Sequence, residues 1–114
     1  MESVTVIIPN LDGEKLLSIC LDSVFKQTFK NFKVVVVDNG SKDNSIQLIS
    51  TKYPKVDVIA HSKNLGFAKA VNLAARKANS EFIAFLNNDA KVSPNWLKYL
   101  TQSLKKDSNL AAAA

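Results

Sequence analysis

Four short apolar runs alternate with four segments of helical periodicity along this chain, and this alternation limits the possible folds more than any other feature. The predicted strands cover residues 4–9, 32–37, 56–60 and 82–86. The second run contains four successive valines, as expected of a strand that is buried on both faces. Strands that alternate with helices are typical of a parallel α/β sheet.

Each predicted helix has its own boundary signal. The first covers residues 14–27, the second follows a cap at Ser41 or Asp43 and ends before Pro54, and the third opens at Gly66. The fourth has Ser93 as its N-cap and Pro94 at its first position. Helical spacing predicts these buried side chains: Leu17, Cys20, Leu21, Val24, Phe25, Ile46, Ile49, Tyr53, Phe67, Val71, Ala74, Ala75, Ala78, Leu97, Leu100 and Leu104.

Composition limits the classes of protein that remain. The chain has 114 residues, of which 46% are hydrophobic, so we expect a single domain over residues 1–114. It contains no apolar run of ~20 residues and no cationic start, which predicts a cytoplasmic protein. Cys20 is the single cysteine and is predicted to pack in the core. The net charge is +5, but the lysines are scattered, so we expect no nucleic-acid partner.

Polar residues follow each predicted strand, at residues 10–13, 38–41, 61–66 and 87–89. The carboxyl ends of parallel strands meet at one edge of a sheet, where ligands of open α/β sheets bind. Taken singly, the first three clusters have ordinary explanations as turns and helix starts. Asp89 is different, because a turn does not need a carboxylate at the end of a buried strand. A carboxylate beside amides suits a divalent cation that also binds water and phosphate.

Four blocks of sequence together resemble one family. "VTVIIPNLDGEKLLSICLDSVFKQTFKNFKVVVVDNGSKDNS", "NLGFAKAVNLA" and "FIAFLNNDAKVSPNWL" resemble the N-terminal half of family 2 glycosyltransferases with the GT-A fold. Within that family, "PNLDG" and "FLNNDA" are most similar to the rhamnosyl- and galactofuranosyl-transferase-like branch. The resemblance implies a Rossmann-like α/β fold with a mostly parallel sheet in the order 3-2-1-4 and helices on both faces.

The same resemblance implies a nucleotide-sugar site. Pro9, Asn10 and Leu11 would form a wall of the pocket, although Leu11 replaces a frequent Tyr. Asp38 and Asn39 would contact the base and the ribose, with Asn39 in place of a frequent second Asp. An amide both donates and accepts hydrogen bonds, so base recognition remains feasible.

The later blocks would hold the diphosphate and a metal ion. The resemblance places Asn64, Gly66 and Asn72 along the diphosphate and ribose, with Lys69 near the phosphates. Residues 87–89 occupy the place of the family's DXD motif. In this chain Asn87 stands at the first acidic position of that motif and would contact the ribose. Asn88 would lie beside it in the nucleotide-sugar site. Asp89 would then be the ligand of Mg²⁺ or Mn²⁺.

The resemblance implies an inverting, metal-dependent transferase in polysaccharide biosynthesis. The donor would be a UDP- or dTDP-linked sugar, and the acceptor a glycan or a lipid-linked glycan at the cytoplasmic face of the membrane. Inversion needs a general base, which we expect beyond the chain end together with the acceptor-binding half, because Asp107 is the only acidic residue after Asp89. We also expect self-association through the surface that such a half would cover.

Three other classes of protein compete with this interpretation. A dinucleotide-binding oxidoreductase should carry G-x-G-x-x-G after the first strand, where this chain offers only Gly13. A sugar-phosphate nucleotidyltransferase should carry a Gly-rich basic loop there, which is also missing. The alternative that remains is a non-catalytic nucleotide-sugar-binding module, or a truncated subunit without the catalytic base.

Overall fold

A computed structural model describes residues 3–106 of the chain, so Asp107 lies outside the described residues. Strands and helices alternate throughout. In chain order they are β1 (Val4–Asn10), α1 (Glu14–Phe25), β2 (Phe32–Asp38), α2 (Ser45–Lys52), β3 (Asp57–Ala60), α3 (Phe67–Lys77), β4 (Phe82–Phe85) and α4 (Trp96–Lys106). The predicted α/β class is therefore confirmed.

The four strands form one parallel sheet in the order β3-β2-β1-β4. This is the order implied by the resemblance. The central strand β1 pairs with β2 along its whole length, so that Asn10 lies beside Asp38 at the carboxyl end of the pair. β4 pairs with β1 from Val4 to Ile7 and ends earlier, which leaves residues 86–89 as a loop beyond the sheet.

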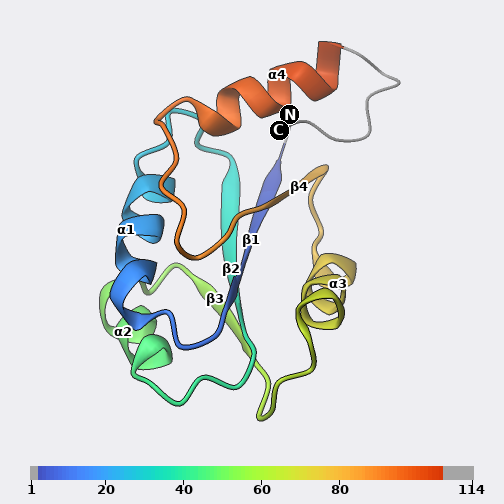
Figure 1. Cartoon of the computed structure of the whole chain (residues 1–114). Helices are drawn as coiled ribbons and strands as arrows, with labels where there is room; N and C mark the ends of the chain where they lie inside the picture. The colour runs from blue at the N-terminus through green and yellow to red at the C-terminus, as the bar shows by residue number, and fades with distance from the viewer. Residues whose placement is uncertain (1–2, 107–114) are drawn as a thin grey trace.

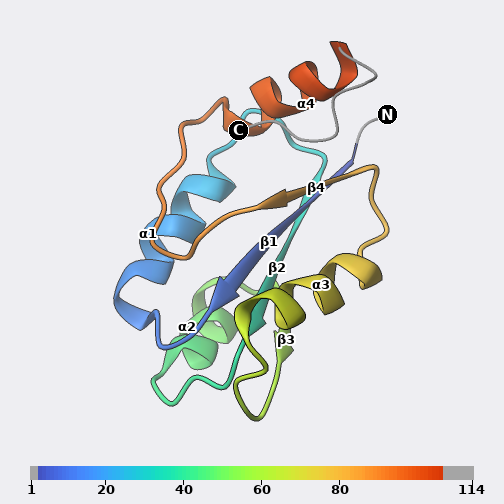
Figure 2. The same ribbon diagram turned by 45° about the vertical axis from the view of Figure 1, so that its right-hand side comes forward.

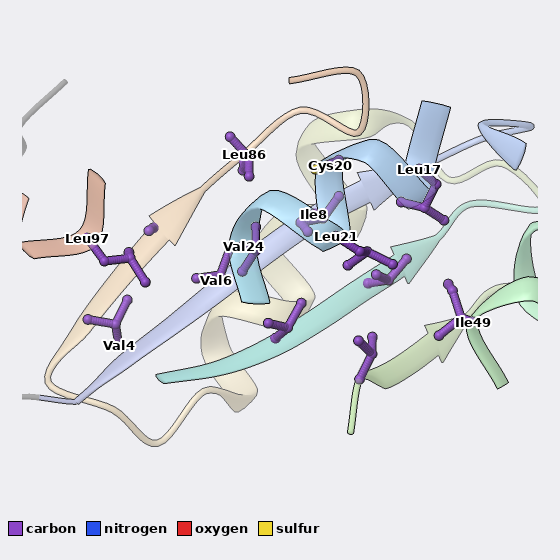
Figure 3. Close-up of a cluster of buried hydrophobic side chains, with 14 residues drawn as sticks. Val4, Val6, Ile8, Leu17, Cys20, Leu21, Val24, Ile49, Leu86 and Leu97 are labelled. Carbon is purple, nitrogen blue, oxygen red and sulfur yellow. The ribbon is translucent and has the colours of Figure 1, made fainter. Parts of the chain in front are cut away.

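Helices cover both faces of the sheet (Figures 1 and 2). α1 and α2 lie on one face, α3 lies on the other, and α4 crosses the amino-terminal end of the strands, away from the loops that follow β1, β2 and β3. The larger core lies between α1 and the sheet (Figure 3), where Leu17, Leu21 and Val24 are fully buried. A smaller core joins α3 to Ile7 and Val37.

The start of α4 differs from the prediction. Ser93 and Pro94 do not open the helix. Ser93 lies before a turn formed by Pro94 and Asn95, and α4 begins at Trp96. The physical reason is the buried amide of Gln27, whose Oε1 accepts the Leu97 N–H at 2.9 Å while its Nε2 donates to the Ser93 carbonyl at 2.6 Å. A side chain that is distant in sequence therefore caps the helix.

Two predicted apolar faces were wrong in part. Phe67 was placed on the inner side of its helix, but its side chain is 61% exposed, and Ala70 is buried in its place. Ile46 of α2 is also exposed, whereas Ile49 is buried as predicted. α2 begins at Ser45 with Asn44 at the N-cap position, so neither Ser41 nor Asp43 is the cap residue.

No helix within residues 3–106 is long and apolar enough to cross a membrane.

Candidate functional site

A pocket of about 320 Å³ opens at the carboxyl edge of the sheet, where the loops after β1, β2 and β4 approach the start of α3. The strand register brings these loops together, because Asn10 and Asp38 end neighbouring strands and Leu86 continues β4 with a hydrogen bond from its N–H to the Ile7 carbonyl. The residues that line the pocket are Pro9, Asn10, Leu11, Asn39, Asn64, Gly66, Phe67, Ala70 and Asn88.

Asn10 occupies the centre of the hydrogen bonds beneath this pocket. It is buried, and its Nδ2 donates to Asp38 Oδ1 at 2.9 Å. Its Oδ1 accepts from Asn88 Nδ2, also at 2.9 Å. The loops after β1, β2 and β4 are therefore joined through one amide.

Asp38 is held by its own neighbours and is only 1% exposed. Its Oδ2 accepts the Ser41 N–H at 2.9 Å, and its Oδ1 accepts both Asn10 Nδ2 and the Ser41 hydroxyl. Hydrogen bonds of this kind satisfy a buried carboxylate that would otherwise be costly. Asp38 therefore braces the site and does not line the pocket.

Asn39 performs a similar task for the loop before α3. Its Nδ2 donates to Asn64 Oδ1 at 2.6 Å, and its Oδ1 accepts the Leu65 N–H at 2.8 Å. Asn64 Oδ1 also accepts the Gly66 N–H. Unlike Asp38, both Asn39 and Asn64 lie on the pocket wall.

The start of α3 also lines the pocket. Gly66 has a φ of 86°, a left-handed conformation that disfavours residues with a Cβ. This turn places Phe67 and Ala70 against the pocket. Neither residue was among the predicted site residues, since the helical pattern assigned Phe67 to the core. The position of Phe67 directly after a loop glycine was the available signal that Phe67 faces a ligand site.

A second set of hydrogen bonds ties the start of α1 to the start of α2. Asp12 Oδ1 accepts the Lys42 N–H at 2.8 Å, and Glu14 Oε1 accepts the Asn44 N–H at 3.1 Å. Asp43 accepts from Glu14 N–H and from both the N–H and the hydroxyl of Ser45. Burial works against ionisation of Asp43, but these hydrogen bonds outweigh it and lower the pKa of Asp43. These hydrogen bonds hold the loop after β1 against the loop after β2, beside the contacts of Asn10 and Asp38.

The loop after β4 carries Asn87 and Asp89 on its exposed side. Beneath it, the Cys20 thiol lies 3.5 Å from the Asn87 carbonyl, and burial, followed by the charge of Asp89, raises the pKa of Cys20 to about 11. Cys20 is therefore a core thiol, as predicted. Within residues 3–106, no three His, Cys, Asp or Glu side chains are grouped closely enough to hold a metal ion.

Asp89 can nevertheless act as a single protein ligand. It is exposed, and it accepts no hydrogen bond from another described residue. One carboxylate suits Mg²⁺ or Mn²⁺ when substrate phosphates and water complete the coordination. The residues present fit that kind of ion and do not fit one held by a closed protein cage.

The predicted site residues fall into two groups. Seven of the eleven predicted nucleotide-sugar contacts line the pocket. The other four, Asp38, Lys69, Asn72 and Asn87, do not line it, and three of these are exposed side chains.

Known proteins resemble this chain along nearly all of its length. The GlyG glycosyltransferase of Streptococcus pneumoniae is 29% identical over 113 residues, which are 96% of this chain and 38% of GlyG. A structure of S. aureus TarS in complex with UDP-GlcNAc superposes with a TM-score of 0.83 at 30% identity, covering 91% of this chain and 31% of the TarS chain.

A third match is a solved structure of a mannosyltransferase. The mannosyltransferase PcManGT of Pyrobaculum calidifontis, in complex with GDP-Man and Mn²⁺, has a TM-score of 0.82 at 26% identity, covering 90% of this chain and 32% of its own. The present chain thus spans about a third of the length of these relatives. The family described as Glycosyl transferase family 2 matches residues 5–114, and this chain belongs to it.

Proposed function

We propose that this chain is the donor-binding part of an inverting, metal-dependent glycosyltransferase. The donor is a nucleotide-diphosphate sugar, and the acceptor is a glycan or lipid-linked glycan in polysaccharide biosynthesis at the cytoplasmic face of the membrane. The acceptor site and the general base are assigned to a region outside these 114 residues. The observation that carries the proposal is the pocket at the carboxyl edge of the sheet, lined by seven residues predicted to contact the donor.

The pocket walls suggest how a nucleotide is held. Pro9 and Leu11 offer apolar surface, and Phe67 offers an aromatic face. Stacking on an aromatic side chain is a general way to hold a base. Asn39 and Asn64 supply polar atoms at the pocket wall; we assign Asn39 to the base or the ribose and Asn64 to the ribose or the diphosphate.

The diphosphate is assigned to the side of the pocket between Gly66 and Asn88. The backbone N–H groups at the start of α3 favour an anion, and Lys69 lies one turn into this helix. Asp89 follows Asn88 and would hold Mg²⁺ or Mn²⁺. When bound, such an ion stabilises the negative charge that develops on the leaving diphosphate.

The relatives support nucleotide-sugar binding without deciding the base, since one is in complex with UDP-GlcNAc and another with GDP-Man. We propose a pyrimidine nucleotide, UDP or dTDP. Calorimetric titration of UDP, dTDP and GDP in Mn²⁺ tests this: tighter binding of UDP or dTDP is expected. Equal or tighter binding of GDP would contradict the pyrimidine assignment, and failure of all three to bind would contradict the proposed site.

A second function remains to be distinguished, namely a module that binds a nucleotide sugar without transferring it. Its pocket would hold the donor in the same way, so binding alone does not separate it from the transferase. Release of UDP from a UDP-sugar, measured with and without a glycan acceptor, separates the two functions. Binding without acceptor-dependent release supports the module.

A further inference from the structure

Three side chains from three separate strand ends form one continuous hydrogen-bonded chain under the pocket. Asn10 Nδ2 donates to Asp38 Oδ1, and Asn88 Nδ2 donates to Asn10 Oδ1, each at 2.9 Å. Asn10 is 2% exposed and Asp38 is 1% exposed. Both ends of the Asn10 amide are thus occupied inside the protein.

The order of donors and acceptors in this chain is determined at Asp38. An ionised carboxylate can only accept hydrogen bonds, so Asn10 must turn its NH₂ group towards Asp38. Its carbonyl oxygen then faces Asn88, which must respond with its own NH₂ group. The amide oxygen of Asn88 has no hydrogen-bond partner among the described side chains. Asn88 therefore keeps an acceptor available at the pocket wall.

Gly13 lies directly against this chain of amides. A Cβ built on Gly13 would come within 2.2 Å of Asn88 Nδ2 and 2.3 Å of Asn10 Oδ1, the two atoms that form the hydrogen bond. The φ of Gly13 is −95°, a conformation that any residue adopts. A methyl group at Gly13 would therefore have to displace the Asn88 or the Asn10 amide and separate the two.

We propose that Asn10 is a positioning residue that holds the loop at residues 87–89 in register with Asp38, and that Gly13 leaves the space for this contact. Asn10 acts through Asn88 and Asp38, and its role rests on the proposed function of the pocket. The loop that it positions carries Asp89. The orientation of Asn88, and with it the response of nucleotide binding to metal, then depends on a residue of β1.

Two single variants break the contact in different ways. Asn10→Leu keeps the branched shape and the number of side-chain heavy atoms but removes the hydrogen bonds to Asp38, Ser41 and Asn88. Gly13→Ala places a methyl group against the bond between Asn88 and Asn10. The control is Thr101→Val, which removes a buried hydroxyl from α4 at the far end of the sheet. A combined variant, Asn10→Asp with Asp38→Asn, exchanges amide and carboxylate, so that each hydrogen bond keeps two complementary partners.

The first readout is the side-chain NH₂ signal of Asn88 in ¹H–¹⁵N spectra of the free protein, which needs neither nucleotide nor metal. It should shift in Asn10→Leu and Gly13→Ala and stay in place in Thr101→Val. The second readout is the ratio of UDP affinity with Mn²⁺ to that with a chelator. We expect this ratio to fall roughly tenfold in Asn10→Leu and in Gly13→Ala, as for the loss of a hydrogen bond to a charged group. The ratio should be higher in the combined variant than in Asn10→Asp alone.

The outcomes separate the two claims. An unshifted Asn88 signal in Gly13→Ala, or a wild-type Mn²⁺ response in folded Asn10→Leu, overturns the positioning role. A wild-type protein that binds no UDP contradicts the proposed function instead, and the Asn88 signal then still decides whether Asn10 positions this loop. If Asn10→Leu does not fold, Gly13→Ala and the combined variant decide the matter.

Discussion

Asp38 ends β2 and Asn39 follows it directly, but their side chains have different hydrogen-bond partners. Asp38 is satisfied entirely by Asn10 and Ser41, whereas Asn39 reaches the pocket wall while it braces Asn64 and Leu65. Sequence could identify both as polar residues at a strand end. It could not show which of them faces the ligand, because that depends on hydrogen-bond partners that are up to 28 residues away.

Phe67 provides a test of the pocket wall at the scale of one residue. Its side chain is 61% exposed and lines the pocket, so Phe67→Ala should remove a stacking surface. We expect UDP affinity to fall by roughly five- to a hundredfold, which corresponds to about 1–3 kcal/mol for base stacking on an aromatic ring. Tyr99→Ala is the control, because Tyr99 is 58% exposed on α4. Equal UDP affinities for the two variants would remove Phe67 from the site.

Asp43 gives an expectation about acid stability. Its folded-state pKa lies below the ordinary value of about 3.9. Because that pKa is depressed, the ionised group stabilises the fold above the unfolded-state pKa, and this contribution is lost as the pH falls through the folded-state value. Asp43→Ala should therefore lower the free energy of unfolding at neutral pH by about 1 kcal/mol, as for a lost helix-start contact, and by less in acid.

Urea denaturation of the wild type and Asp43→Ala, each at neutral pH and at about pH 3, measures this difference. Asp57→Asn serves as the control, since Asp57 is exposed at the opposite end of the sheet. A difference between wild type and Asp43→Ala that stays constant across both pH values would show that the ionised carboxylate contributes nothing.

At the scale of whole elements, the alternation of apolar runs predicted every strand and helix of the described chain in the right order. The errors fall where a side chain from elsewhere in the sequence intervenes. Gln27 delays the start of α4, and the turn at Gly66 rotates Phe67 out of the core. Local patterns measure what a segment prefers by itself, and they contain no information on a cap supplied from 70 residues away.

Gln27 joins α1 to α4 and can be tested directly. Gln27→Met keeps the length of the side chain but leaves the Leu97 N–H without its buried acceptor. The Ser93 carbonyl loses one of its two donors and keeps the Trp96 N–H. We expect the free energy of unfolding to drop by about 1–3 kcal/mol, the cost of leaving one buried donor unsatisfied. Gln47→Met is the control, because the Gln47 side chain is exposed on α2. Chemical denaturation measures the free energy of unfolding of both variants. If both variants are equally stable, the cap does not hold α4.

Among residues 3–106, the edge strand β4 carries two exposed large apolar side chains. Phe85 pairs with Ile7 in register, so both side chains lie on the α3 face of the sheet, where the smaller core covers Ile7. Phe85 is left 56% exposed and Ile83 38% exposed beside a strand edge that has no neighbour among residues 3–106. Edges of this kind favour pairing with another chain.

We therefore expect the 114-residue chain to self-associate as its concentration rises, as measured by light scattering. Phe85→Lys should weaken this association, since a charge opposes edge pairing, whereas Tyr99→Lys should not. A wild-type chain that stays monomeric up to its solubility limit would contradict the expectation.

We propose that the pocket binds a nucleotide diphosphate with the help of a metal ion held by Asp89. The decisive measurement is the UDP affinity of wild type, Asp89→Asn and the control Asp57→Asn, by calorimetry with Mn²⁺ and with a chelator. All three should bind equally in chelator. Mn²⁺ should strengthen binding in wild type and Asp57→Asn, and Asp89→Asn should lose roughly tenfold to a hundredfold of affinity in Mn²⁺. A wild-type response to Mn²⁺ in Asp89→Asn would place the metal elsewhere and contradict the account.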